Sequence, residues 1–319
     1  MPFCGIAGHS KAIATIRRIL GSGRVAHAYL FTGPEGIGKR KVATAFIEAL
    51  FCGRDEGCGE CISCRKIASG NHPDIHTLEP DGQFIKVDQV RDFQKSLAFK
   101  PYEAPRKACI IDGADRFNPS SGNSLLKTLE EPPGNALMIL LASAPDAVLS
   151  TIRSRCQILP FSGIPEDEIA AFLAQNGSDS GSAMVAASLC AGSMAKALSL
   201  SSEEIMGDRS DIITRACNLS TKNMIELFAF GELFDKDREK TLQALELLTG
   251  FWRDMLHLAN GSPKVVNSDL LNLLQRETKR RSTEALLRGI EALGRTRQAI
   301  LRNGNVRLSM DVLSMQLSI

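Results

Sequence analysis

Apolar and polar positions in the first half of the chain follow two different periods. Short runs that are almost wholly apolar predict buried β-strands, and segments in which apolar residues return every three or four positions predict amphipathic helices. The predicted strands are 28–31, 74–78, 107–111, 136–142 and 156–161, and the predicted helices are 10–20, 42–50, 87–97, 123–131 and 149–153. Strands that alternate with helices predict a parallel sheet, with its ligand site at the carboxyl ends of the strands.

Strand signals disappear after Gly163, and the rest of the chain has helical periodicity. A Gly/Ser-rich joint at 176–182 leads to two short helices that end near Ser202. Further on, Leu286, Ile290, Leu293 and Ile300 share one helix face. We therefore expect an α/β domain at 1–162, a small helical domain at 163–203 and an all-α domain at 204–319.

The glycine-rich stretch after the first strand predicts a phosphate-binding loop. Gly33, Gly36, Gly38 and Lys39 match G-x-x-x-x-G-K-[ST], and a predicted strand and helix flank them as that motif requires, which makes a chance glycine turn the weaker interpretation. Backbone N–H groups and Lys39 would contact phosphate oxygens. Arg40 stands where Ser or Thr would hold Mg²⁺. Phosphate binding is expected, and whether the loop binds nucleotide is left open.

A second element of such sites follows the third strand. Asp112 ends that strand, as does the carboxylate that holds Mg²⁺ in P-loop ATPases. Gly113 stands where these enzymes usually carry a water-activating Glu, and we expect Asp115 to cap the next helix.

Four cysteines are clustered between the first two strands. Cys58, Cys61 and Cys64 are spaced two residues apart, and five residues separate Cys52 from Cys58. Four thiolates in this arrangement predict one structural tetrahedral Zn²⁺ site, whereas no thioredoxin-like context supports a redox role. His72 and His76 are alternative zinc ligands. The scattered cysteines are expected in the core; they are Cys4, Cys109, Cys156, Cys190 and Cys217.

Composition excludes several classes of protein. Hydrophobic residues make up 44% and charged residues 23% of the 319 residues, which is typical of globular proteins. The formal net charge of +2 argues against a polybasic nucleic-acid-binding protein. The longest apolar run, 136–144, is too short to span a membrane, and the N-terminus has no signal-peptide pattern. We expect a cytoplasmic protein with reduced cysteines.

These motifs together resemble the clamp-loader proteins of the AAA+ class from bacterial DNA polymerase III. The resemblance rests on the phosphate loop, the cysteine module at 52–64, the stretch Asn123–Pro133 with Leu-Glu-Glu-Pro-Pro, and the tripeptide Ser154-Arg155-Cys156, in this order. It is strongest over residues 1 to about 200. It implies a P-loop AAA+ domain with a zinc module, a helical lid and a helical collar that holds a ring of subunits together.

The resemblance also implies partners and roles. The ring opens a sliding clamp and places it on primer–template DNA, and its gamma/tau motor subunits hydrolyse ATP beside a delta subunit. Arg155 would be an arginine finger for a neighbouring motor's ATP, a kind of contact that contributes about 10³–10⁵ in rate. The alternative for Arg155 is an ion pair with a local carboxylate.

Three departures predict that this chain does not hydrolyse ATP itself. Arg40 and Gly113 replace the metal-binding hydroxyl and the catalytic Glu, and Ala195 stands where the motor subunits carry a sensor arginine. The main alternative is a gamma/tau-type motor. An autonomous zinc-dependent DNA-binding protein is disfavoured, because no basic recognition helix adjoins the cysteines.

Overall fold

The chain is described by a computed structural model that covers residues 3–54, 57–201, 203–234, 237–262 and 265–318. Contacts divide the chain into two compact units, Met1–Ile169 with Gly192–Ala195, and Ala170–Ala191 with Lys196–Ile319. Residues 55 and 56 of the predicted zinc module and residue 202, near the predicted end of the small helical domain, lie outside the described residues. The domain boundaries after 162 and 203 stay predictions.

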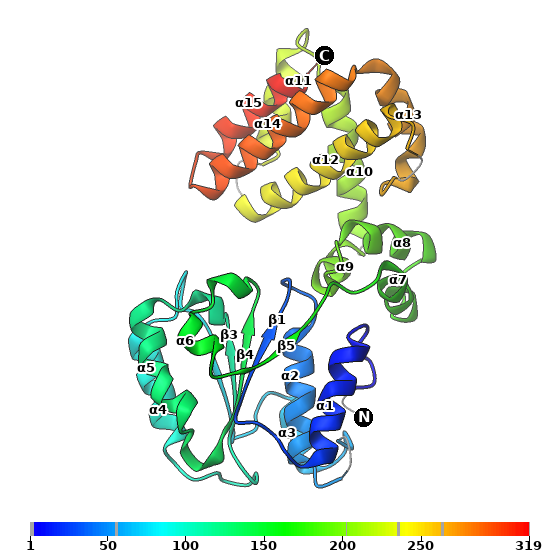
Figure 1. The fold of residues 1–319 in the computed structure, drawn as a ribbon. Helices are drawn as coiled ribbons and strands as arrows, with labels where there is room; N and C mark the ends of the chain where they lie inside the picture. The colour runs from blue at the N-terminus through cyan, green and yellow to red at the C-terminus, as the bar shows by residue number, and fades with distance from the viewer. Residues whose placement is uncertain (1–2, 55–56, 202, 235–236, 263–264, 319) are drawn as a thin grey trace. The chain divides into compact units, whose positions relative to one another are not determined.

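The first unit is built on a parallel five-stranded sheet with the order β2-β3-β4-β1-β5 (Figure 1). The strands are β1 (Ala28–Thr32), β2 (Ile75–Leu78), β3 (Ala108–Asp112), β4 (Leu137–Ala142) and β5 (Gln157–Pro160). The parallel sheet, and all five predicted strands to within two residues at each end, are therefore confirmed.

Helices cover both faces of this sheet, with α1 and α2 on one side and α4 and α5 on the other (Figure 1). Their bounds are α1 (Ser10–Ser22), α2 (Lys39–Phe51), α3 (Ile62–Ala68), α4 (Val87–Leu97), α5 (Pro119–Glu130) and α6 (Ser150–Arg153). Tyr29 and Phe31 of β1 pack into the α1–α2 core, whereas Ala28 and Leu30 pack into the α4–α5 core. Burial on both faces explains why the strands read as continuous apolar runs.

Asp74, directly before β2, organises a distant loop. Its side chain is fully buried, and it accepts hydrogen bonds from the backbone N–H groups of Tyr102, Glu103 and Ala104 at 2.6, 2.8 and 2.8 Å. Burial by itself raises the pKa of this carboxyl, but the N–H donors outweigh burial and lower the pKa below its ordinary value. Asp74 is thus held as a carboxylate that fixes the backbone of 102–104.

The same loop exposes two aromatic rings. Phe99 and Tyr102 are 71% and 85% exposed, and the Nζ of Lys66 in α3 donates to both carboxylate oxygens of Glu103, at 2.8 and 2.6 Å. The loop is therefore held from the sheet side by Asp74 and from the cysteine module by Lys66.

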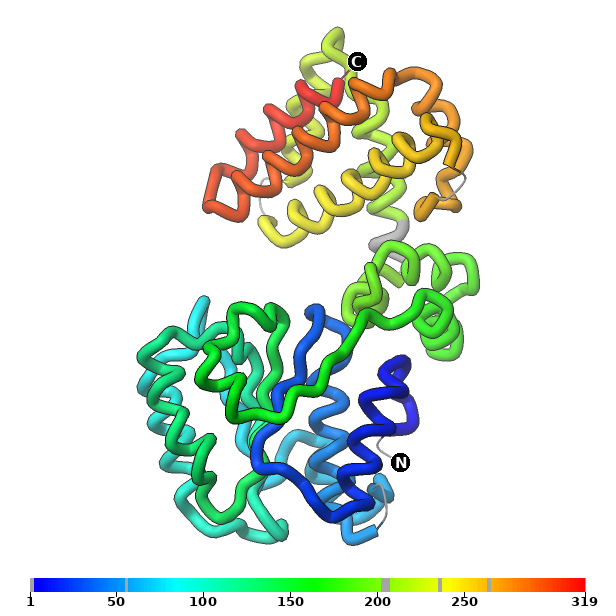
Figure 2. The backbone as a smooth tube through the Cα atoms, in the orientation of Figure 1, coloured from blue at the N-terminus to red at the C-terminus, as the bar shows by residue number. Residues whose placement is uncertain are grey.

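The second unit is helical (the green to red part of the tube in Figure 2). Its elements, together with the helices that join it to the first unit, are α7 (Glu166–Gln175), α8 (Ser180–Leu189), α9 (Met194–Leu200), α10 (Glu203–Asn218), α11 (Met224–Glu232), α12 (Arg238–Ala259), α13 (Leu271–Arg280), α14 (Thr283–Leu301) and α15 (Val306–Leu317). Leu286, Leu293 and Ile300 are buried on one face of α14, with Ile290 packed beside them, as their spacing predicts.

Two buried charged side chains of the second unit, Arg209 and Glu277, form ion pairs. Arg209 is 1% exposed and donates to Asp269 at 2.7 Å, and Glu277 accepts hydrogen bonds from Arg276, Arg280 and Arg281. Buried charges without partners cost several kcal/mol, so these networks fix how the helices pack.

The environment of the scattered cysteines was predicted only in part. Cys109, Cys190 and Cys217 are buried, but Cys4 is exposed and Cys156 is half-buried. The prediction that all of them lie in the core is wrong for Cys4, which lies before α1 in an exposed position. No described helix has the length and apolar character needed to cross a membrane.

Replacing Asp74 tests the loop clamp. Asp74→Asn places an amide group among three N–H donors, and we expect the free energy of unfolding to fall by about 2–3 kcal/mol at neutral pH. Because the folded-state pKa is lowered, the stabilisation by Asp74 is present above the unfolded pKa of about 4 and is lost as pH falls through the folded value. Urea titrations across this range measure the difference.

The exposed Asp88 in the first turn of α4 supplies the control. Asp88→Asn should change stability by less than about 0.5 kcal/mol. A wild-type advantage over Asp74→Asn that stayed constant down to about pH 2 would contradict the assignment of an ionised Asp74.

Candidate nucleotide edge and metal site

The carboxyl ends of the central strands bring the predicted nucleotide-site residues together. Thr32 pairs with Ala142, and Asp112 pairs with Leu141, so β1, β3 and β4 end at one edge of the sheet. The phosphate loop follows β1 at this edge, and Gly38 is the N-cap residue of α2. The predicted loop and the predicted acidic residue therefore share one site.

The glycines of the loop are required by its backbone. Gly36 and Gly38 have φ of 74° and 101°, in the left-handed region that disfavours other residues. A Cβ on Gly33 would collide with the carbonyl oxygen of Phe161, and one on Gly36 would collide with the hydroxyl of Ser193. The loop thus has a close-packed shape that favours glycine at positions 33, 36 and 38.

Lys39 is turned onto its own loop. Its side-chain Nζ donates to the carbonyl oxygens of Gly33 at 2.6 Å and Pro34 at 2.7 Å, and lies 3.4 Å from Ser143 Oγ. The residue is 7% exposed, and burial lowers its pKa while the carboxylate of Asp112 opposes that shift. The ammonium group that would contact phosphate is already hydrogen-bonded within the loop.

Arg40 lies between two acidic side chains. Its Nη1 donates to Glu79 Oε1 and lies 3.6 Å from Asp112 Oδ2. Burial raises the pKa of the Asp112 carboxyl above its ordinary value. The positive charge of Arg40 opposes this shift, and the negative charge of Glu79 adds to it. Glu79, directly after β2, was not predicted as a site residue; an acidic residue at the end of a parallel strand was the signal for it.

The position directly after Asp112 carries no side chain that could act as a general base. Gly113 has φ of 83°, and a Cβ there would lie 3.0 Å from Pro80 Cγ. Asp115 does not cap α5, contrary to the prediction, because Asn118 is the N-cap and accepts from Ser121 N. The carboxylate of Asp115 instead accepts from the backbone N–H groups of Ser143 and Ala144, at 3.3 and 3.1 Å.

A segment remote in sequence closes one side of the phosphate loop. Ala195 N donates to the carbonyl oxygen of Gly36 at 2.9 Å, and Ser193 is 6% exposed. Ala195, the residue aligned with the sensor arginine of motor subunits, therefore contacts the loop through its backbone.

Arg155 lies in the turn between α6 and β5. Its Nε donates to Glu130 Oε1 at 2.7 Å, its Nη2 also pairs with Glu130, and its Nη1 donates to Thr151 O at 3.0 Å. The ion pair with a local carboxylate, the alternative from the sequence, is thus formed in this chain. The guanidinium side chain is still 34% exposed and that of Glu130 49%.

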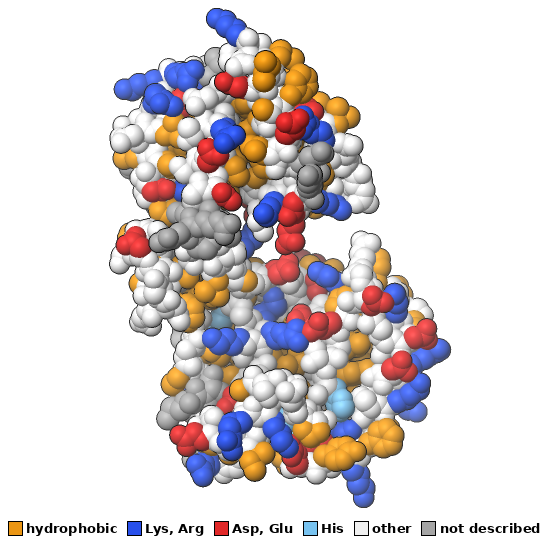
Figure 3. Space-filling view, turned by 180° about the vertical axis from the view of Figure 1, so that it is seen from behind, with side chains coloured by type: hydrophobic (Ala, Val, Ile, Leu, Met, Phe, Trp, Pro, Cys, Tyr) orange, Lys and Arg blue, Asp and Glu red, His pale blue; other side chains and the backbone are white. Residues whose placement is uncertain are grey.

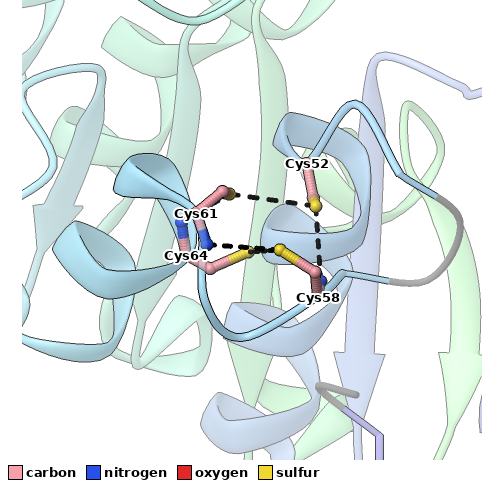
Figure 4. Close-up of side chains that lie close together, drawn as sticks. All are labelled: Cys52, Cys58, Cys61 and Cys64. Atoms are coloured by element: carbon pink, nitrogen blue, oxygen red, sulfur yellow. Dashed lines mark hydrogen bonds between the residues drawn. The ribbon is translucent and has the colours of Figure 1, made fainter.

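The four predicted cysteines converge on one point (Figure 4). Their sulfur atoms all lie within 4.8 Å of one another, and they form the only group of at least three His, Cys, Asp or Glu ligand atoms found among the described residues. Cys52 ends α2, and Cys61 caps α3 by accepting from Cys64 N. The two histidines lie outside the cluster. His72 is buried 3.4 Å from Glu103, and His76 lies in β2.

The cysteine geometry fits a tetrahedral zinc ion. The sulfur atoms of Cys52 and Cys61 are 3.9 Å apart and those of Cys58 and Cys64 are 4.0 Å apart. Zn–S bonds of about 2.3 Å give a tetrahedron with S···S edges of about 3.8 Å. N–H groups of Glu60 and Cys61 lower the pKa of Cys58 to about 6, so its thiolate form is present at neutral pH. All four thiols are free of disulfides.

Comparisons with known proteins agree with this geometry. A family model described as "DNA polymerase III, delta subunit" matches residues 8–165, and one described as "DNA polymerase III, delta subunit, C terminal" matches residues 204–313. The chain is 31% identical to DNA polymerase III subunit delta′ of Bacillus subtilis over 301 residues, which are 92% of this chain and 91% of that protein. It is 41% identical to the delta′ subunit of Pseudomonas aeruginosa over 150 residues, 45% of this chain and 46% of that one.

Two further similarities are to a tau subunit and, at the level of the fold, to a gamma subunit-related protein. It is 32% identical to the tau subunit of Bacillus subtilis over 77% of this chain and 45% of that protein. A gamma subunit-related protein from Thermotoga maritima shares the fold, with a TM-score of 0.53, 20% identity, and coverage of 96% and 98% of the two chains.

The parallel sheet, the phosphate loop and these matches define a clamp-loader protein of the AAA+ class. Among such proteins the chain belongs to the family of DNA polymerase III delta′ subunits. The clamp-loader resemblance drawn from the motifs is confirmed.

Removing one thiolate tests the metal site. Protein purified without chelator should contain one zinc per chain by elemental analysis, and Cys61→Ser should lose it, because three thiolates no longer close the tetrahedron. Structural zinc supplies about 10 kcal/mol or more in small modules. We therefore expect local unfolding at 52–64, seen as faster amide exchange there, while the sheet core stays protected.

Cys4→Ser is the matched control, since Cys4 is exposed and outside the cluster. It should retain zinc. Stoichiometric zinc in Cys61→Ser would rule out this four-cysteine site.

Proposed function

We propose that this clamp-loader subunit does not hydrolyse ATP and instead completes the ATP site of a neighbouring motor subunit with Arg155. The observation that carries the proposal is a contrast within one chain. An exposed, permanently charged guanidinium stands in the turn after α6, whereas Gly113 stands at the position of the water-activating carboxylate.

Loss of hydrolysis follows from side-chain chemistry. A glycine cannot orient or deprotonate a water molecule, and Ala195 offers no charge to a γ-phosphate. Binding of ATP or ADP at Gly33, Gly36, Gly38 and Lys39 would not by itself restore turnover. The subunit then acts as a fixed neighbour in the ring rather than as a motor.

The ion pair between Arg155 and Glu130 is compatible with a role in trans. Both side chains are well over a quarter exposed, and surface ion pairs contribute only about 0–1 kcal/mol. An arginine finger contributes a factor of about 10³–10⁵, equal to about 4–7 kcal/mol. In the transition state of hydrolysis, contact of the guanidinium with a neighbour's phosphate would therefore outweigh the loss of the ion pair with Glu130.

The remaining parts receive roles in the same assembly. We assign a structural zinc ion to Cys52, Cys58, Cys61 and Cys64, a lid role to residues 163–203 and a collar role in ring assembly to residues 204–319. The partners would be gamma/tau and delta subunits, the sliding clamp and primer–template DNA, in the cytoplasm.

A gamma/tau-type motor is the second candidate, favoured by the similarity to the tau subunit of Bacillus subtilis. Gly113 argues against it. Independent DNA binding has less support, because the net charge is +2 and basic and acidic side chains are interspersed on the face drawn in Figure 3.

A reconstituted loader tests the finger. Gamma/tau and delta subunits, clamp and primed DNA are held constant. Arg155→Ala should then remove from the steady-state ATPase rate the contribution of the one ATP site that Arg155 completes. At that site the loss is about 10³-fold or more. Size-exclusion chromatography should show an intact ring.

Three variants separate the finger from a structural role. Arg153→Ala changes an exposed arginine at the end of α6, two residues before Arg155, and should leave the rate unchanged. Glu130→Ala removes the ion pair of Arg155 but keeps its charge, so it should retain ATPase. Lys39→Ala should also retain it. Equal losses in Glu130→Ala and Arg155→Ala, or an unchanged rate in Arg155→Ala, would overturn the role.

A further inference from the structure

The phosphate loop contains two cationic side chains, and both are bound by the chain itself. Lys39 donates to the carbonyl oxygens of Gly33 and Pro34, and Arg40 lies between Glu79 and Asp112. In P-loop enzymes the corresponding lysine contacts phosphate, and the next residue and the strand-end Asp hold Mg²⁺. In this chain Lys39 and Asp112, the side chains that would bind phosphate and Mg²⁺, already have partners within the protein.

The residues at the metal position do not fit Mg²⁺. Magnesium needs oxygen ligands at about 2.0–2.1 Å in an octahedral arrangement. At position 40 the hydroxyl is replaced by a guanidinium, whose Nη1 lies 3.6 Å from the carboxylate of Asp112. A divalent cation bound to Asp112 would lie next to this positive charge, and like charges at such a distance repel.

A guanidinium satisfies the same carboxylates without a metal. It is always charged and carries five N–H donors in a fixed fork, so one group can serve two carboxylates. Glu79 directly follows β2, Asp112 ends the neighbouring strand β3, and Arg40 lies in the first turn of α2. Without Arg40, two carboxylates would face each other at the edge of the sheet.

We propose that Arg40 takes the place of the magnesium ion of the phosphate loop, pairing with Asp112 and Glu79 so that the loop keeps its folded shape without metal or nucleotide. The chain then excludes magnesium–nucleotide complexes by charge. This inference concerns the chain's own loop and does not depend on the role of Arg155.

Nucleotide binding to the isolated chain tests the proposal. Fluorescence anisotropy of a fluorescently labelled ATP is measured with millimolar Mg²⁺ and with EDTA. Wild-type protein should show no tighter binding with Mg²⁺ than with EDTA. Arg40→Thr supplies a hydroxyl and frees both carboxylates, and its affinity should rise tenfold or more with Mg²⁺, equal to about 1.4 kcal/mol. Mg²⁺ alone should also raise its melting temperature.

Two controls isolate the guanidinium. Arg40→Lys keeps the positive charge and should gain no magnesium dependence. Arg91→Thr removes an exposed arginine that pairs with Asp88 in α4, away from the loop, and should behave as wild type. A folded Arg40→Thr with no gain from Mg²⁺ overturns the proposal. So does a tenfold gain in the wild type, which decides the question even where Arg40→Thr fails to fold.

Discussion

The structure of the first unit depends on the burial of β1 between two parallel neighbours. β1 pairs with β4 on one side and β5 on the other, and its side chains enter both hydrophobic cores. A strand hydrogen-bonded on both edges and covered on both faces has almost no freedom to shift register. The loop that follows it therefore starts from a fixed point, and the ends of β3 and β4 are fixed relative to that point.

This fixed edge concentrates charge, and the chain balances that charge internally. Lys39, Arg40, Glu79, Asp112 and Asp115 all lie there, each in contact with a partner from the protein. In an enzyme, phosphate and metal would complete such a balance during each cycle. Here the charged side chains already have partners within the protein in the absence of any ligand.

The fold was predictable because its signals are local. Apolar runs located the strands, and the break at the proline pair located the end of α5, which stops at Glu130. Helix α3 was missed, because the cysteines that surround it mask the helical period in a segment of only seven residues. The helix cap at Asn118, in place of Asp115, depended on where the chain turned after β3.

The site was predictable in composition but not in connections. The glycines, Lys39, Asp112 and the four cysteines were found from motif spacing, because the chemistry of phosphate and metal binding requires that spacing. Glu79 and Glu130 were not identified as partners of Arg40 and Arg155, since these contacts join residues 39 and 25 positions apart. Such pairings follow from the packing of α2 against β3 and β4 of the sheet and of α5 beside α6, which no single segment reveals.

The link from Lys66 to Glu103 has a consequence for the aromatic loop. Lys66 belongs to α3, the helix that Cys61 caps and that contains Cys64, while Glu103 belongs to the loop that exposes Phe99 and Tyr102. The helix beside the cysteine module is therefore linked by an ion pair to the loop that contains Phe99 and Tyr102. A metal ion held by the four cysteines would fix the start of α3, and through Lys66 it would limit the movement of the loop that exposes Phe99 and Tyr102.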